Sequence, residues 1–551
     1  MNFKDFFDRI FNMGQPNRVN KKGKSRRKPW WFILLITLVI MFVYFFFALP
    51  SLSPMGMELY FTIIIGIVLF WFLMALFGRK PKTAKSFLVT LGVIAVCILF
   101  PAIMRFIGSP IFMASQYKNL IEVREGVFDE EIDQIHMSQV PVVDREAAAV
   151  IGEKEMGAVG DLVSQFDIAA YYSQINIAGK PYRVSPLFYN DFFKYLWNFR
   201  DGIQYYVSVD MNTQEGDLVK LDEAIMYSNS DYLMRDFDRH LRFQYPFALF
   251  GETNFEIDDN GKAWYVTPKL TKRIALFSAP DTQGIYLTDA HTGESTYYDK
   301  ADIPEWVDRA YPAENILDQL NWHGRFVNGF WNSIFGQRNV TSTTEGYNYI
   351  SIGTDLHLIT GVTSVRSDTS NLGFYYVNLR TKEATFYPQP SATEYAAMSS
   401  ARGKVQEKGY NPTFPVILNI QGRPVYFMSL KDQSLTAKMF ALVDAEQFTN
   451  VVVGDTVPQV MAKYYETNPN KDGPAEIEGE FTELTLTHTA GMVEDGNTVF
   501  YFQVKEDSKV YRADPENLGP AIAFLKPGQK IKVIAQEGED YNNILKIEFS
   551  N

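Results

Sequence analysis

The stretch "NIAGKPYRVSP" (residues 176–186) places two strand-like runs on either side of a glycine turn. The stretch "NIQGRPVYFMS" (419–429) repeats its pattern of Asn-Ile-x-Gly, a basic residue and Pro. Each stretch follows a segment with helical features, at 140–157 and 391–409, and Asp144 is placed to cap the first of these helices. The pattern predicts a recurring unit of one helix and an antiparallel hairpin. Chance similarity of two unrelated hairpins is the alternative.

The stretch "DDNGKAWYVTP" (258–268) is open to two interpretations. A calcium loop of EF-hand type needs oxygen ligands at alternating positions and a Glu at the twelfth. Here the two aspartates are adjacent, and the twelfth position is Lys269. Asn260-Gly261 instead favours a tight turn between two strands. We therefore predict a third, diverged hairpin and no metal site.

A second turn motif also recurs. The stretches "VDMNTQEG" (209–216), "TDAHTGES" (288–295) and "VNLRTKEA" (377–384) share Asp or Asn followed by Thr three residues later. Such side chains accept hydrogen bonds from backbone N–H groups of a turn. We interpret the three stretches as hairpin turns rather than ligand sites.

A helix followed by an antiparallel sheet with D-x-x-T-G-E at a turn resembles the PepSY family of extracytoplasmic modules. Asp289, Thr292, Gly293 and Glu294 match that turn, and the other two copies depart from it. The resemblance implies a place in the cell envelope and an association with peptidase propeptides and regulatory domains. The whole layout also resembles large membrane proteins of Gram-positive bacteria.

Composition limits the classes of function. Of the 551 residues, 46% are apolar, which is enough to bury several cores. The single cysteine, Cys97, excludes disulfides and Cys-based metal sites. Residues 1–107 carry a net charge of +11, whereas residues 108–551 carry −23. So acidic a surface argues against nucleic-acid binding, which needs Lys and Arg to neutralise phosphates.

Three apolar stretches, Trp30–Leu49, Leu59–Phe77 and Phe87–Met104, are each close to the roughly 20 residues that cross a bilayer as a helix. The basic segments at 17–28 and 78–85 should both be cytoplasmic. We therefore predict a multi-pass protein of the plasma membrane, with a cytoplasmic N-terminus and an extracellular C-terminal region.

The predicted fold class is three transmembrane helices, then an α+β region of PepSY-like units, then a small β-barrel of OB or SH3 type. Residues 1–14 have the pattern of an amphipathic helix, which would lie on the inner leaflet or bind a partner. The predicted parts are the amphipathic helix and basic segment (1–28), the membrane helices (29–107), a first α+β region (108–300), a second α+β region (301–467), a linker (468–479) and the barrel (480–551).

The segment 320–351 concentrates polar and aromatic side chains with several glycines. Such a segment can bind a sugar or a peptide, or it can be a tightly wound connection whose polar groups satisfy buried backbone. The candidate ligand-binding residues are Trp322, His323, Arg325, Asn328, Trp331, Asn332 and Arg338. No two of the six histidines lie within five residues of each other, so we predict no catalytic residues, metal site or cofactor from local motifs.

Three hypotheses about function follow. The first is a membrane-anchored envelope protein, not an enzyme, whose outer modules bind a protein partner or a cell-wall polymer in a scaffold or regulatory role. The second is an envelope hydrolase or transferase acting on peptidoglycan or peptides, with His323 in its site. The third is an accessory subunit of a transport or secretion complex. Modular repetition without catalytic signatures favours the first.

Overall fold

The computed structural model describes residues 30–77, 84–134, 140–365, 367–468 and, with short gaps, 481–549. The predicted amphipathic helix and the basic segment at 17–28 lie outside these residues, as do nearly all of the predicted linker and most of the basic segment at 78–85.

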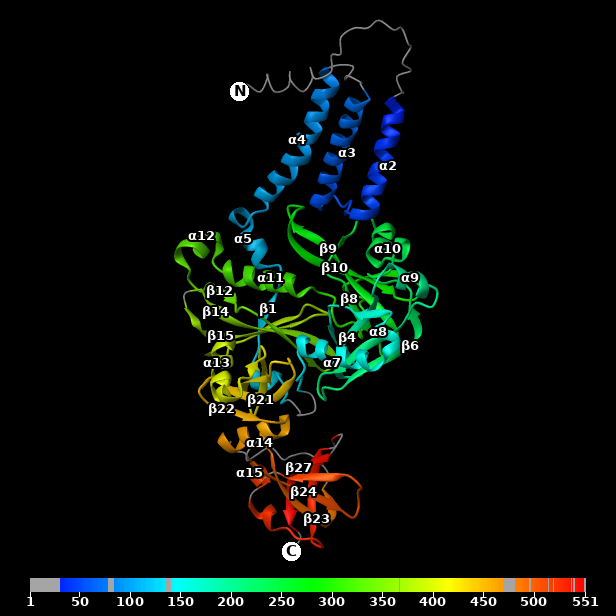
Figure 1. The fold of residues 1–551 in the computed structure, drawn as a ribbon. Helices are drawn as coiled ribbons and strands as arrows, with labels where there is room; N and C mark the ends of the chain where they lie inside the picture. The colour runs from blue at the N-terminus through cyan, green and yellow to red at the C-terminus, as the bar shows by residue number, and fades with distance from the viewer. Residues whose placement is uncertain are drawn as a thin grey trace. The chain divides into compact units, whose positions relative to one another are not determined.

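Three apolar helices come first (Figure 1): α2 (Trp30–Ala48), α3 (Met57–Leu76) and α4 (Ala84–Ile107). Each is long enough to cross a bilayer. Most of their side chains are exposed although nearly all are apolar, which suits a helix surrounded by lipid. The three predicted membrane helices are confirmed as helices of the required length and composition.

The region that follows contains four copies of one plan, in which a helix precedes a sheet with five shared strands. In the third copy the sheet has seven strands, because β1 (Val123–Glu125) and β17 (Ser391–Ala392) add to the shared five. In each copy two short strands pair with the same edge of a long strand, a second long strand pairs with its other edge, and a last strand pairs with the second. We call the copies repeats 1 to 4. The sequence predicts the recurrence, and the structure shows that it is fourfold.

The bounds of the elements are as follows. Repeat 1 comprises α7 (Arg145–Ala158), β2 (Phe166–Ile168), β3 (Ser173–Ile177), β4 (Lys180–Tyr189), β5 (Ile203–Asp210) and β6 (Gly216–Ile225). Repeat 2 comprises α10 (Phe237–Gln244), β7 (Leu249–Phe250), β8 (Asn254–Ile257), β9 (Ala263–Ile274), β10 (Ser278–Asp289) and β11 (Ser295–Asp299). Repeat 3 comprises α11 (Ala313–Arg325), β12 (Thr341–Thr343), β13 (Asn348–Ile352), β14 (Asp355–Ser364), β15 (Ser367–Asn378) and β16 (Ala384–Tyr387). Repeat 4 comprises α13 (Glu394–Lys404), β18 (Asn411–Pro412), β19 (Val416–Ile420), β20 (Arg423–Lys431), β21 (Ala437–Asp444) and β22 (Val451–Gly454), and α14 (Val457–Thr467) follows it.

Side-chain caps start the helices of three repeats. Asp144 accepts from the N–H of Ala147 at 2.9 Å, as the sequence predicts for α7. Asp236 caps α10 and Thr393 caps α13 in the same way. Each cap satisfies one of the N–H groups that a helix leaves unpaired at its start.

The predicted hairpins are confirmed as β3–β4, β8–β9 and β19–β20. In the first and last, Gly179 and Gly422 hold positive φ at two-residue turns. Repeat 3 has a fourth such hairpin, β13–β14, whose Gly353-Thr354 turn lacks the Asn-Ile-x-Gly pattern.

The hairpin of repeat 2 turns through a longer loop than the tight Asn-Gly turn that the sequence predicts. Ile257 is paired with Ala263, and Gly261 has positive φ whereas Asn260 does not. One carboxylate oxygen of Asp258 accepts from the N–H groups of Asn260 and Lys262, both at 2.9 Å. Its other oxygen accepts from the Trp264 indole at 3.0 Å. This carboxylate therefore holds the loop.

The second turn motif recurs in all four repeats, at Asp210, Asp289, Asn378 and Asp444. In each, one side-chain oxygen accepts from the N–H groups two and three residues later, at 2.8–3.1 Å. The N–H of the next residue donates to a backbone carbonyl at the start of the first long strand, which is its second residue in repeats 1, 3 and 4 and its first residue, Ala263, in repeat 2. This turn therefore fixes the register between the two long strands.

The repeats share cores. One cluster of buried side chains draws on all four repeats, and a second joins repeats 2 and 3. The segment after α4 contains α5 (Pro110–Lys118), β1 (Val123–Glu125) and α6 (Phe128–Glu131). Strand β1 pairs in parallel with β16, so this early segment completes the sheet of repeat 3.

Five further strands pair in a ring at the C-terminus: β23 (Thr482–Glu494), β24 (Asn497–Val504), β25 (Val510–Ala513), β27 (Tyr541–Phe549) and β26 (Lys530–Gln536). Two short helices, α15 (Pro515–Leu518) and η5 (Pro520–Phe524), follow β25. Phe502 and Val533 are among the buried side chains at the centre of the ring.

The turn acceptor makes a testable prediction. Replacing Asp210 with Ala leaves two N–H groups without their acceptor and should lower the free energy of unfolding by about 1–2 kcal/mol. Asp210→Asn should be close to wild type, because Asn378 performs the same function in repeat 3. Urea denaturation of the detergent-purified chain measures both. An Asn variant as unstable as the Ala variant would contradict this role.

Candidate functional site

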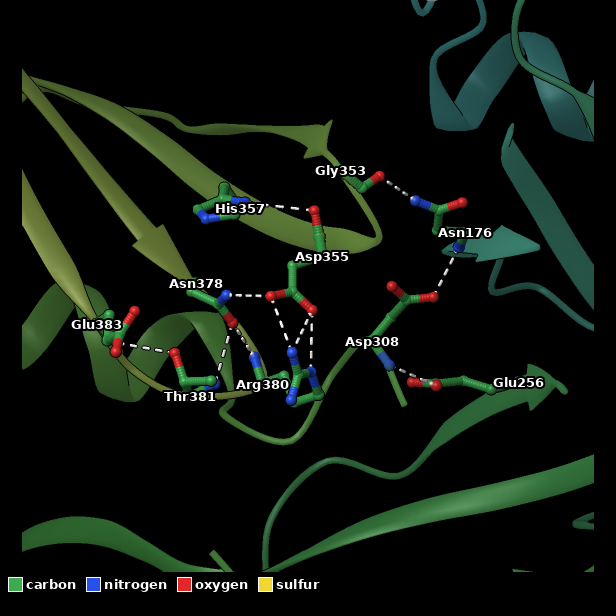
Figure 2. A network of polar contacts seen from close by, with 10 residues as sticks. All are labelled: Asn176, Glu256, Asp308, Gly353, Asp355, His357, Asn378, Arg380, Thr381 and Glu383. Carbon is green, nitrogen blue, oxygen red and sulfur yellow. Dashed lines mark hydrogen bonds and ion pairs between the residues drawn. The ribbon is translucent and has the colours of Figure 1, made fainter. Parts of the chain in front are cut away.

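The hairpin turns of repeats 1 and 3 and strand β8 of repeat 2 converge on one polar network (Figure 2). The N–H of Asn176 donates to Asp308 Oδ2 at 2.6 Å, and its side-chain amide donates to the Gly353 carbonyl at 3.2 Å. The two oxygens of Glu256 accept from the N–H groups of Asp308 and Arg309, at 3.0 and 3.1 Å. Asp308 therefore ties the segment between repeats 2 and 3 to repeat 1.

Two carboxylic acids of this network are deeply buried. Glu256 is 1% exposed and Asp308 is 3% exposed. Burial raises the pKa of Glu256 to about 7, although the two N–H groups and Arg309 act in the opposite direction. Burial and the neighbouring Glu256 raise the pKa of Asp308 well above its ordinary value. Burial therefore favours the protonated form of both acids in the folded chain.

In three repeats an ion pair joins the turn of the hairpin to the turn that follows the second long strand. In repeat 3 the Arg380 guanidinium binds both oxygens of Asp355, at 2.7–2.9 Å, and the Asn378 amide donates to the same carboxylate at 2.7 Å (Figure 2). Repeat 2 uses Lys262 and Asp289 at 2.8 Å, and repeat 4 has Arg423 and Asp444 at 3.9 Å. In repeats 2 and 4 the cation lies at the first turn and the acid at the second, whereas in repeat 3 the acid lies at the first turn and the cation at the second.

The arrangement of this network suits cohesion of the fold. Its acids bind backbone N–H groups or neighbouring cations. Within the described part of the chain, no three His, Cys, Asp or Glu side chains are grouped as a metal site requires. The sequence does not predict this network. The available signal was an acid, Glu256, between the apolar residues Phe255 and Ile257 of a predicted strand.

The candidate residues at the start of 320–351 lie at the end of α11. Trp322 packs edge-on against Tyr117 of α5, with ring centroids 4.9 Å apart. His323 Nδ1 lies 3.1 Å from the Lys118 carbonyl, and burial lowers the pKa of this imidazole. Arg325 is exposed, with its guanidinium 5.9 Å from the centre of the Phe326 ring.

The remaining candidates lie in and around α12 (Gly329–Trp331) and the π-helical turn η3 (Asn332–Gly336). The amides of Asn328 and Asn332 both donate to the Arg338 carbonyl at 3.0 Å, and the Arg338 N–H donates to Asn332 Oδ1 at 3.2 Å. Trp331 stacks on Phe335 with centroids 5.9 Å apart. The asparagines therefore close the loop, whereas Trp331 points outward and is 63% exposed.

A different surface was not singled out from the sequence. Helix α9 (Phe192–Asn198) joins β4 to β5, and the turn η2 (Leu233–Arg235) lies beside it. The Arg235 guanidinium donates to the Phe199 carbonyl and lies over the Phe199 ring, which ties η2 to α9. The α9 surface consists of exposed Phe192, Phe193, Leu196, Trp197, Tyr232, Leu233 and Met234.

The α9 surface is an addition to the repeat plan. In repeats 2, 3 and 4 the two long strands are joined by short turns, as between Ile274 and Ser278. Repeat 1 inserts α9 at this position, and the insertion leaves Trp197 81% exposed. A loop inserted on a rigid scaffold is where binding residues concentrate, and an exposed apolar patch marks an interaction site.

The buried acids predict a pH dependence. A carboxyl whose pKa is raised by folding stabilises the protein below its unfolded pKa, and this stabilisation is lost as the pH rises to about 7. In Glu256→Gln the melting temperature should fall less steeply between pH 5 and pH 7.5. The variant should also be less stable at pH 5, by on the order of 1–3 kcal/mol, because an amide nitrogen would face an N–H group.

Exposed Glu252 supplies the control, since Glu252→Gln should melt like wild type at every pH. Differential scanning fluorimetry of the three proteins in detergent makes the comparison. Equal slopes for wild type and Glu256→Gln would show that Glu256 does not titrate in this range.

No protein-family model matches the chain, and no curated protein matches it. The PepSY resemblance therefore stays a prediction.

Proposed function

We propose that this chain is a multi-pass protein of the plasma membrane whose outer region binds a protein partner through the α9 surface, in a scaffold or regulatory role. The N-terminus would be cytoplasmic and the region from residue 108 on would be extracellular. The charge distribution supports this orientation, because basic segments flank the first and third spans on one side.

The observation that carries the proposal is the exposure of Trp197 among apolar neighbours on an inserted helix. Tryptophan and tyrosine are the residues that most often dominate binding at protein interfaces. A cell-wall polymer is the weaker ligand for this surface. It would require hydrogen-bonding or cationic side chains, and Arg235 and Arg239 here donate to backbone carbonyls.

The attachment of the outer region supports a regulatory role. The loop between α2 and α3 is hydrogen-bonded to repeat 2. The Leu52 N–H donates to the Pro246 carbonyl at 2.8 Å, and Ser51 Oγ donates to the Ala248 carbonyl at 2.9 Å. A passive anchor needs only a flexible linker. Here the loop between two spans is hydrogen-bonded to the connection between α10 and β7 of repeat 2.

We also propose that the four repeats are PepSY-like and that the C-terminal ring is a small barrel of OB or SH3 type. Each repeat has a helix before an antiparallel sheet, and Asp289, Thr292, Gly293 and Glu294 form a turn between two strands. The ring is supported by five strands that each pair with two neighbours. An experimental structure of the full chain tests both assignments.

Site-specific photo-crosslinking tests the binding proposal. A benzophenone amino acid at position 197 in intact cells should give a discrete protein adduct. Phe193→Ser should reduce that adduct at least about fivefold by removing a neighbouring apolar contact. Position 395 on α13 is a matched control, because Tyr395 is also an exposed aromatic residue.

Three results decide the test. The same adduct at positions 197 and 395 would mean non-specific proximity and would contradict the proposal. Adducts to lipid alone would contradict a protein partner. Binding of the detergent-purified chain to isolated cell walls, without any protein adduct, would favour a wall polymer instead.

A further inference from the structure

A second exposed apolar surface is formed by three segments that are distant in the sequence. They are α5, the tip of the β9–β10 hairpin, and α12 with η3. Helix α5 packs against both α11 and α12, as Figure 1 shows. The exposed apolar side chains are Ile111, Phe112, Leu276, Trp331, Ile334 and Phe335. Together with the Lys and Arg residues of the same segments, they form what we call the basic aromatic surface.

This surface is built on a small core of its own. Tyr117 of α5, Ile274 of β9 and Phe326, which follows α11, share a single buried cluster, and Phe330 of α12 packs against it. The Tyr117 hydroxyl also donates to the Gly108 carbonyl at 2.9 Å. The outward side chains are therefore held in place from beneath, and Phe335 is nevertheless 76% exposed.

The charge of the surface is opposite to that of the rest of the region. Residues 105–121, 269–280 and 320–340 contain no Asp or Glu. Their Lys and Arg residues are Arg105, Lys118, Lys269, Lys272, Arg273, Arg325 and Arg338. Residues 108–551 as a whole carry a net charge of −23, so these three segments concentrate cations in an acidic region. Asp281, directly after the second segment, is paired with Arg273 at 4.0 Å.

The chain connects this surface directly to a membrane span. Helix α4 ends at Ile107 and α5 begins at Pro110, so only Gly108 and Ser109 separate them. Three residue steps span at most about 11 Å. The start of α5 must therefore lie at the bilayer surface where α4 leaves the hydrocarbon.

We infer that the basic aromatic surface seats in the headgroup layer of the leaflet at which α4 ends, and that it binds anionic lipid. Trp331 and Phe335 enter the interface, where aromatic rings are favoured, and the surrounding Lys and Arg side chains meet lipid phosphates. Of the residues that the sequence suggested as a ligand site, Trp331, Arg325 and Arg338 thus act on lipid. This inference is independent of a partner at the α9 surface.

The α9 surface differs in the property that matters for lipid. The segments that carry it, 187–202 and 228–242, contain equal numbers of acidic and basic residues. An anionic bilayer gains no net attraction there. The two surfaces therefore suit different ligands. The α9 surface suits a protein partner, and the basic aromatic surface suits a layer of anionic lipid headgroups.

Fluorescence quenching in lipid nanodiscs tests the inference with the full chain. In a Cys97→Ser background, Phe335→Cys, Leu276→Cys and Tyr395→Cys each provide one thiol for an NBD label. Lipid spin-labelled near the headgroup should quench the label at 335 and 276 at least about twofold more than at 395. Replacing part of the phosphatidylcholine by phosphatidylglycerol should increase quenching at 335.

The double variant Arg325→Gln and Arg338→Gln should remove the increase caused by phosphatidylglycerol. Unchanged melting temperature and gel-filtration volume establish that each variant is folded. If the labels at 335 and 276 are quenched no more strongly than the label at 395 in both lipid mixtures, the surface does not lie in the headgroup layer. Quenching that is strong but independent of lipid charge would overturn the binding of anionic lipid. Nanodiscs contain no other protein, so neither result depends on a partner at α9.

Discussion

The two N–H groups of Asp308 and Arg309 have one buried carboxylate, Glu256, as their acceptor, and much of the sheet-rich region depends on this contact. It fixes the segment between repeats 2 and 3. It thereby holds Asp308 where it accepts from Asn176 of repeat 1. An unpaired N–H group at such a depth costs as much as a lost hydrogen bond, so an acid is retained where an apolar side chain would otherwise pack. Three repeats are joined at one point.

The repeats combine a constant frame with variable edges. The turn acceptor at Asp210, Asp289, Asn378 and Asp444 is nearly unchanged, and so is the pairing of the strands around it. Two parts vary: the connection between the two long strands, and the segment that follows each helix. The α9 surface includes the first of these parts in repeat 1, and the basic aromatic surface includes the second in repeat 3. Both exposed apolar surfaces therefore include parts that the frame does not require.

The sequence predicts what is local and periodic in this fold. The apolar helices, the cap at Asp144, three hairpins and three of the four Asx turns follow from patterns of a few residues. The hairpin of repeat 3 was missed because the turn after Ile352 lacks the shared motif. The network of Glu256 and Asp308 was missed because its members are 52 residues apart and meet only through tertiary packing. Exposure is likewise a property of packing, so Trp197 could not be distinguished from a core residue.

The parallel pairing of β1 with β16 has a consequence for the order of synthesis. Strand β1 leaves the membrane first, yet its partner is made roughly 260 residues later. Until then its backbone groups form an unpaired strand edge, which is a template for pairing with other chains. Repeats 1 and 2 can build their own sheets during this interval, but the sheet of repeat 3 stays incomplete until β16 has been made. A nascent chain that stalls before Ala384 would thus display an open strand at the membrane surface, where a chaperone or a quality-control protease could recognise it.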